Sequence, residues 1–228
     1  MKENLMKKLV SIISSLILFT IVSANAEMGI GLSGAAHLIE GSGTETTRDS
    51  SEKNNGSHDE QTIVPELFIE AIDDSNGLTV GISYIPVRDV GSKSRTDTAV
   101  AAAAGGAEND TGTYTAKAEL ENVIKLYTDI PTGSQVLGAD TYVHLGVQHV
   151  TVTTLESLNS GSTYPDRDLL GATIGFGAKG DLPFGNNLYY KSELTYTNFE
   201  TYEATSNGNK VTADLEDIAA RLSIGYKF

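Results

Sequence analysis

The chain has 228 residues, with 16 Lys and Arg against 30 Asp and Glu, and it contains no cysteine or tryptophan. The absence of cysteine excludes a disulfide scaffold and a thiolate site, and the formal charge of −14 argues against the basic face that nucleic-acid binding needs. With 39% hydrophobic residues the sequence is too polar for a helical membrane protein. It is not too polar for a transmembrane β-barrel, whose strands are apolar on one face only.

The N-terminal segment 1–26 has the features of a cleaved export signal. Three lysines precede an apolar stretch, and Ala24-Asn25-Ala26 is the small-x-small pattern that a signal peptidase cuts after. The apolar stretch is interrupted by serines and is short for a spanning helix, which needs about 20 apolar residues. We therefore expect cleavage after Ala26, with Ala24 and Ala26 as the recognised residues, and a barrel domain over residues 27–228.

The remainder of the chain alternates between apolar and polar residues with a period of two, which is the pattern of β-strands. Successive side chains of a strand point to opposite faces, so each of these segments has one apolar face and one face that is small or charged. The alternation predicts eight strands. They occupy residues 28–38, 63–71, 78–84, 114–126, 142–148, 170–179, 188–197 and 218–228.

The connections between these strands alternate in length. Short ones lie at residues 73–77, 129–138 and 180–187, and long polar ones at residues 41–60, 89–112, 156–168 and 201–210. Outer-membrane barrels have short periplasmic turns and long external loops, whereas sandwiches mix long connections between both ends. The predicted fold is therefore all-β: an eight-stranded antiparallel up-and-down transmembrane β-barrel with short periplasmic turns and long external loops.

Glycine and proline positions refine this barrel. Many strand glycines share the polar parity, where small residues relieve crowding inside an eight-stranded barrel. Pro65 falls within a strand, and we expect a β-bulge there because proline cannot donate a ladder hydrogen bond. The glycines expected to face inward are Gly29, Gly31, Gly81, Gly146, Gly171, Gly175, Gly177 and Gly225.

Ionisable residues on the polar parity define a candidate lumen charge network. Its members are Glu66, Glu70, Lys117, Glu119, Glu121, Lys125, Lys191, Glu193 and Arg221. Buried charges must be paired or hydrated, so the favoured interpretation is a set of salt bridges that fills the lumen. The alternative is a narrow water or ion path in which the charged pairs exchange partners.

The last strand carries an assembly pattern. Leu222, Ile224, Tyr226 and Phe228 alternate along it and end in a terminal phenylalanine. This ending resembles the C-terminal signature of bacterial outer-membrane β-barrels, and eight strands behind an export signal resemble the small OmpA/OmpX-type superfamily. The resemblance implies that these four residues are read by the barrel-insertion machinery, and that periplasmic chaperones attend the chain during assembly. The absence of tryptophan departs from the usual aromatic belt.

These observations predict a monomer in the outer membrane of a Gram-negative bacterium, in contact with membrane lipid and lipopolysaccharide, with a structural or cell-surface interaction role. Two alternatives remain: a narrow porin-like channel for small solutes or ions, and a soluble periplasmic β-barrel that binds a ligand inside. No catalytic, cofactor or metal site is expected. No histidine follows His149, so the last strands lack the base that a barrel hydrolase needs.

Overall fold

A computed structural model describes residues 11, 26–46, 53–97, 112–155, 163–183, 187–206 and 208–228. Apart from Ser11 and Ala26, the predicted export signal, including Ala24, lies outside these residues. Within the described ranges, no helix is both long enough and apolar enough to cross a membrane.

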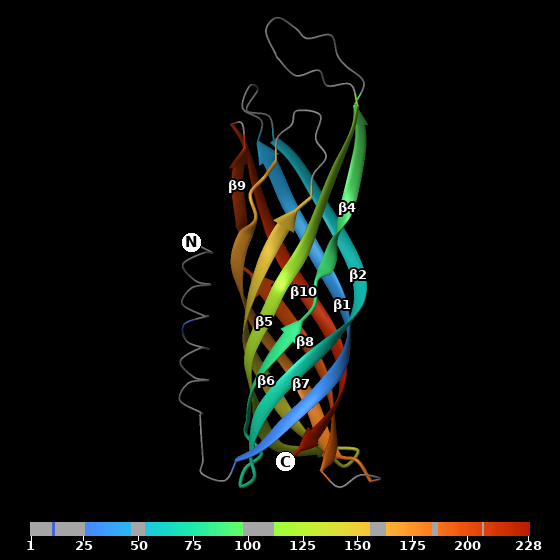
Figure 1. Ribbon diagram of the computed structural model, residues 1–228, viewed down its shortest axis with the longest axis vertical. Coiled ribbons are helices and arrows are strands. Elements are labelled where there is room, and N and C mark those ends of the chain that lie inside the picture. The colour runs from blue at the N-terminus through green and yellow to red at the C-terminus, as the bar shows by residue number, and fades with distance from the viewer. Residues whose placement is uncertain are drawn as a thin grey trace, which may run out of the picture.

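The described residues form an antiparallel sheet that closes into a barrel, with its strands tilted relative to the barrel axis (Figure 1). The strands are β1 (Ala26–Thr46), β2 (Lys53–Asp73), β3 (Thr79–Ile85), β4 (Arg88–Asp97), β5 (Gly112–Val136), β6 (Ala139–Thr154), β7 (Arg167–Asp181), β8 (Leu188–Phe199), β9 (Tyr202–Ser206) and β10 (Asn209–Lys227). The ring order is β1-β2-β3-β5-β6-β7-β8-β10, and β10 pairs with β1 to close it. β4 continues the ring position of β3 by pairing with β5, and β9 continues the ring position of β8 by pairing with β10. The ten strands therefore occupy eight positions in the barrel, as predicted.

Apolar side chains cover the outside of the barrel near its short-turn end. Large outward residues that are exposed there include Ile30, Leu32, Leu67, Ile69, Ile82, Ile174, Phe176, Leu222 and Ile224. An aliphatic surface of this extent is unsuited to water and fits the acyl chains of a bilayer. The inward parity of the same strands carries the buried polar and charged residues, which is the orientation expected of a membrane barrel.

Inward glycines accommodate large aromatic rings across the strand pairs. A Cβ atom at Gly31 would lie 2.2 Å from the Phe68 ring, and one at Gly81 would lie 2.3 Å from the Tyr127 ring. Each aromatic ring therefore occupies the space above a glycine of the neighbouring strand, where a side chain would otherwise lie. The directly opposed pairs are Gly31–Phe68, Gly81–Tyr127, Gly171–Phe199, Gly177–Tyr142 and Gly225–Tyr189.

The strands continue into stretches that the sequence predicted to be long loops. β1 extends to Thr46 and β2 begins at Lys53, and their ladder pairs through Thr46 and Lys53. β4 and β9 likewise fill parts of the expected loops at residues 89–112 and 201–210. Backbone hydrogen bonds do not require an apolar face, so polar strands beyond the lipid-facing rows give no alternation signal.

The β-bulge that redirects side chains of the predicted lumen network lies on β5 and not at Pro65. The pairing of β1 with β2 runs without a shift through Gly34 and Pro65, so the predicted bulge there is wrong. On β5 the register with β6 shifts between Glu121 and Ile124, and Asn122 adopts a φ of 52°. The extra residue reverses which parity faces inward on the two sides of the bulge.

Candidate functional site

The charge network in the short-turn half of the lumen begins at Glu66, a residue that is 2% exposed. Its carboxylate accepts a hydrogen bond of 2.7 Å from the Ser83 hydroxyl and lies 2.9 Å from Nζ of Lys125. The Nε of Arg221 donates to the second oxygen of the same carboxylate. One carboxylate from β2 thus joins cations from β5 and β10 across the lumen.

A second carboxylate from β2, that of Glu70, anchors the part of the network nearest the turns. It accepts hydrogen bonds from the hydroxyls of Tyr127 at 2.6 Å and Tyr189 at 2.8 Å. Nζ of Lys191 lies 3.0 Å from Glu70 and 2.6 Å from Asp129. Lys191 is therefore held between two buried carboxylates, which is the pairing that a buried ammonium group requires.

His144 connects the two parts of the network. Its Nδ1 lies 2.7 Å from Asp129 and 3.0 Å from Glu193, and Glu193 lies 3.8 Å from Arg221. One ligand atom each of Asp129, His144 and Glu193 fall within 4.8 Å of one another, an arrangement that could hold a metal ion. Lys191 and Arg221 already supply positive charge to these carboxylates, so ion pairs account for the cluster without a metal.

The structure brings together six of the nine residues predicted for the lumen network, namely Glu66, Glu70, Lys125, Lys191, Glu193 and Arg221. Lys117, Glu119 and Glu121 lie on the other face of β5, because the bulge at Asn122 reverses the parity. Lys117 is bonded to Glu119 at 2.7 Å and to Asp89 at 3.0 Å on the outer face. These hydrogen bonds, chiefly the one that Lys117 donates to Glu119, raise the pKa of the Lys117 ammonium group.

A separate buried triad that the sequence did not predict lies farther up the lumen. Asp217 lies 3.0 Å from Nδ1 of His37 and 3.1 Å from Nη1 of Arg88. Asp217 has the same parity as Arg221, and Asp129 has the same parity as Lys125. Extending the predicted strands by a few residues would have found both carboxylates, whereas Arg88 lies beyond the break between β3 and β4 and shows no such signal.

The long-loop half of the lumen is filled by apolar side chains. Ile39, Ile85, Leu120, Val123 and Val150 are all 0% exposed there. The complete cluster is Ile39, Val64, Ile85, Val90, Leu120, Val123, Val150, Val152, Tyr164, Leu169, Phe199, Tyr202, Ala204 and Leu215. The sequence predicted only small or charged inward residues, so this apolar half is a correction.

The space left in the charged half is very small. A cavity of about 10 Å³ lies between Glu66, Lys191 and Arg221, which is room for about one water molecule. Nη1 of Arg221 and Nε2 of His144 have no hydrogen-bond partner among the described residues. A single bound water would satisfy groups of this kind.

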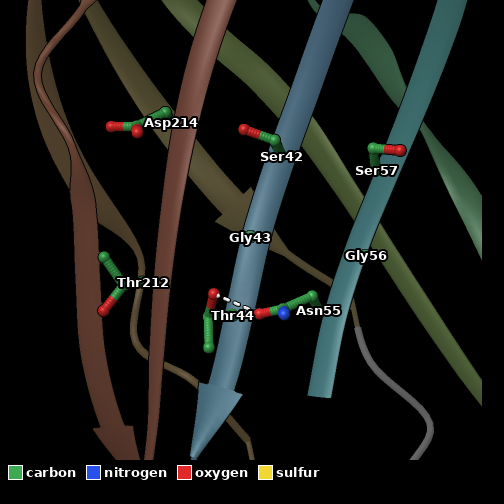
Figure 2. A pocket seen from close by; sticks show the side chains of 8 residues that line it. All are labelled: Ser42, Gly43, Thr44, Asn55, Gly56, Ser57, Thr212 and Asp214. Atoms are coloured by element: carbon green, nitrogen blue, oxygen red, sulfur yellow. Dashed lines mark hydrogen bonds between the residues drawn. The ribbon is translucent and has the colours of Figure 1, made fainter. Parts of the chain in front are cut away.

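The outer face carries a hollow beyond the apolar rows, which we call the outer shelf (Figure 2). Its volume is about 450 Å³. The lining residues come from the ends of three adjacent strands and are short: Ser42, Gly43 and Thr44 of β1, Asn55, Gly56 and Ser57 of β2, and Thr212 and Asp214 of β10. Ser42 is directly opposed to Ser57 and Asp214, and Thr44 to Asn55 and Thr212.

The final strand places the predicted assembly residues outside the barrel. Leu222 is 72% exposed and Phe228 70% exposed, and Ile224 and Tyr226 are also exposed on the same outward row. β10 pairs with β1 at this end, as in the register of Gly29 with Lys227. The four side chains are therefore presented together on the surface next to the closing seam.

The chain is similar in structure to several solved outer-membrane proteins. The outer membrane protein OprG from Pseudomonas aeruginosa matches with a TM-score of 0.56 and 17% identity, over 90% of this chain and 97% of that one. The outer membrane protease OmpT from Escherichia coli matches with a TM-score of 0.49 and 8% identity, over 92% and 99%. The attachment invasion locus protein Ail of Yersinia pestis matches with a TM-score of 0.38 and 11% identity, over 90% and 99%.

These likenesses concern the fold. No protein-family model matches the sequence, and no curated protein matches it in sequence. The class of protein is nevertheless clear from the closed ring, the outward apolar rows and the likeness to OprG: the chain has the fold of a small outer-membrane β-barrel. Its eight strand positions are consistent with an OmpA/OmpX-like barrel fold.

Proposed function

We propose that this protein is an outer-membrane barrel with a closed lumen, which acts through its surface in a structural or cell-surface interaction role. The observation that carries the proposal is the filled interior. Apolar side chains occupy the long-loop half and paired charges occupy the short-turn half, where the cavity among the charged groups has a volume of about 10 Å³. A path for hydrated solutes needs far more space than one water molecule occupies.

The proposed location follows from the outside of the barrel and from the export signal. Outward rows such as Leu32, Ile69 and Leu222 suit acyl chains, and segment 1–26 supplies a route across the inner membrane. We propose that the protein is a monomer that contacts outer-membrane lipid and lipopolysaccharide. Exposure of Tyr226 and Phe228 on the last strand supports their proposed recognition by the barrel-insertion machinery.

The proposal includes no catalytic activity. The carboxylates of Glu66, Glu70 and Asp129 are each held by a buried cation, and they lie inside a lumen that is too narrow to admit a substrate. His144 is stacked on Tyr127 and paired with carboxylates, and no serine of the described residues is bonded to it.

Recordings in planar bilayers test the closed lumen against the channel alternative. The purified, folded protein is expected to give no reproducible conductance steps, while a trimeric porin in the same bilayers serves as the positive control. Regular steps from the protein itself would overturn the closed lumen and favour the porin-like alternative. Rare, irregular openings of the bilayer that also occur with protein-free detergent are the background of the measurement.

Fractionation tests the location against the soluble alternative. The protein is expected in the outer-membrane fraction, and its gel mobility is expected to change when the sample is boiled, as a folded barrel is compact and resists detergent. Recovery of the native protein in the soluble periplasmic fraction would contradict the proposed membrane location.

A further inference from the structure

The outer shelf lies on the same strands as the lipid-facing rows, and an outward acidic row, in which Glu40 is paired with Glu216 and Asp59, separates the two. The last outward apolar residues on β1 and β10 are Leu38 and Ile218, which are paired with each other. Ser42 follows Leu38 by four positions, which is about 13 Å along a strand. With the strand tilt of about 40° that is typical of these barrels, the shelf begins about 10 Å above the apolar rows along the membrane normal.

The height of the shelf distinguishes the headgroup of a phospholipid from the saccharide headgroup of a glycolipid. The headgroup region of a phospholipid leaflet adds about 5–8 Å to the hydrocarbon core. A phospholipid headgroup therefore ends below the shelf. A glycolipid whose sugars extend outward from the membrane surface reaches it, so the shelf lies at the level of saccharide and not of acyl chain or phosphate.

The chemistry of the shelf suits a saccharide. Its outward side chains are hydroxyls, an amide and a carboxylate, which together donate and accept hydrogen bonds as sugar hydroxyl groups require. They are short, so little rotamer entropy is lost when they are held by a ligand. The hollow of about 450 Å³ falls in the size range of small-molecule sites, which is about 300–1,000 Å³.

Several shelf groups are free to bind a ligand. Thr44 donates to Asn55 at 2.8 Å, and Asp214 accepts from Thr201 at 2.7 Å. The hydroxyls of Ser42, Ser57 and Thr212 form no side-chain hydrogen bond with any other described residue. Three unpaired hydroxyl groups from three adjacent strands thus line one hollow.

Two other places on the outer face of the described strands differ from the shelf. On β4 and β5 the ammonium group of Lys117 is bonded to Asp89 and Glu119, so long charged side chains bind one another. On β6 the hydroxyl of Thr151 donates to Asp168 at 2.8 Å. These groups already have partners, whereas the outer shelf on β10, β1 and β2 has three hydroxyl groups without one among the described residues.

We propose that the outer shelf binds the saccharide headgroup of the outer-leaflet glycolipid, lipopolysaccharide, through hydrogen bonds from Ser42, Ser57 and Thr212 to sugar hydroxyls. This occupant is favoured because the shelf lies on three strands whose lipid-facing rows end about 10 Å below it, at a height that glycolipid saccharide reaches and phospholipid headgroups do not. The inference rests on the proposed outer-membrane location. It assigns a site and a chemical class to a contact that the proposed function leaves general.

The test uses the full-length mature barrel in phospholipid nanodiscs, with native mass spectrometry as the readout. Three probes are titrated: lipopolysaccharide that carries its core oligosaccharide, lipid A alone, and additional phospholipid. The lipopolysaccharide with core sugars is expected to bind at least tenfold more tightly than lipid A. Equal retention of lipid A would overturn the inference, because acyl chains or phosphates would then account for binding.

Variants locate the site. The triple variant Ser42→Ala, Ser57→Ala and Thr212→Val removes the free hydroxyl groups with little change in volume, and it is expected to weaken binding of the core-bearing lipid about tenfold. The control variant Thr151→Val with Thr153→Val alters hydroxyls on the outer face of β6 and is expected to bind as the unaltered protein does. Heat-modifiable gel mobility confirms that each variant is folded.

Each outcome of these measurements either supports or overturns the proposed saccharide site. If the triple variant binds as tightly as the unaltered protein, or if the control weakens binding equally, the shelf is not the site. If the folded protein shows no preference for the core-bearing lipid, the inference fails while the proposed function stands. A failure of the proposed function is seen separately, as conductance in planar bilayers or recovery in the soluble fraction.

Discussion

The two halves of the barrel bury different kinds of side chain, charged and aromatic groups in the short-turn half and mainly aliphatic groups in the long-loop half. In the short-turn half of β1, Leu32 faces outward and Ser33 faces inward, whereas in the long-loop half Ser42 faces outward and Ile39 faces inward. The parity of the strand does not change between them. Along β1 the same parity faces outward throughout, but the apolar residues lie on the outward parity in the short-turn half and on the inward parity in the long-loop half.

The same inversion on β10 shows that the surroundings cause it. Leu222 is outward and Arg221 inward in the short-turn half, while Asp214 is outward and Leu215 inward in the other. Lipid outside the wall favours apolar outward residues and leaves polar groups for the interior. Water outside the wall favours the reverse, as in a soluble protein. One half is thus built as a membrane barrel and the other as a soluble barrel, with the boundary close to residue 39.

The charged half is expected to be the more sensitive to loss of a single group. Replacement of Glu66 by Gln leaves Lys125 and Arg221 without their shared carboxylate, and removal of one partner from a buried ion pair costs about 3–5 kcal/mol. Urea unfolding of the refolded barrel in detergent micelles, followed by gel mobility, measures this loss.

Glu119 provides the matched control for that change, because it was predicted to lie in the same network but faces outward. Glu119→Gln alters an ion pair with the partly exposed Lys117 on the outer face and is expected to leave the free energy of unfolding unchanged within error. Equal losses for the two glutamine variants would contradict the placement of Glu119 outside the lumen.

The glycine and aromatic pairs are expected to give the next largest effect. A Cβ at Gly31 would lie 2.2 Å from the Phe68 ring and 2.5 Å from the backbone oxygen of Ile224, which cannot move aside without disturbing the ladder. Overpacking of this kind costs about 1–3 kcal/mol, and we expect Gly31→Ala to lie at the upper end.

Gly34 on the same strand is the control for Gly31. It faces outward, and a Cβ atom at this position would have no neighbouring atom within 4 Å, so Gly34→Ala is expected to be nearly neutral. Unfolding curves for the two alanine variants that coincide would show that the aromatic rings are not packed against the wall in the described way.

The strands and the charged half of the lumen could be predicted from the sequence because both follow from a period of two. Glu66, Glu70, Lys191 and Arg221 each lie on the parity opposite to an apolar row of the same strand. The apolar half could not be predicted in this way. Where water lies on the outside, inward leucine and valine give the same alternation as outward leucine and valine beside lipid, so the pattern alone does not say which face is which.

The bulge at Asn122 explains the remaining error within the network. A single additional residue exchanges the two faces of a strand, so Glu119 and Glu121 appear to continue the row of Lys125 although they face the opposite way. Asparagine tolerates a positive φ, but it is also common in regular strand ends and loops, so Asn122 alone did not mark the bulge. Pro65, which was expected to mark one, faces outward in a regular ladder.

Reciprocal isosteric changes test the division between the halves more finely. Val150→Thr places a hydroxyl in the apolar half without a partner, which costs about 1–3 kcal/mol. Thr173→Val in the charged half removes hydrogen bonds with Gln148 and Thr197 and is expected to cost about 1 kcal/mol. Urea midpoints at constant slope give both values. A stabilising Val150→Thr would mean that water reaches the interior of the long-loop half.

The smallest net effect is expected at the boundary, where Arg88, His37 and Asp217 form a buried polar triad just below the apolar cluster. Nε and Nη2 of Arg88 have no partner among the described residues, so the desolvation of its guanidinium group is only partly offset. Replacement of a buried ionic group by apolar residues of similar volume is often neutral or stabilising. The triple variant Arg88→Met, His37→Leu and Asp217→Leu is therefore expected to change the free energy of unfolding by less than about 1 kcal/mol. Asp217→Leu alone leaves the buried Arg88 without its carboxylate partner and is expected to lower the free energy of unfolding by about 3–5 kcal/mol. If the triple variant loses as much as the single one, the polar triad is required at the boundary and the apolar half cannot simply be extended toward the membrane.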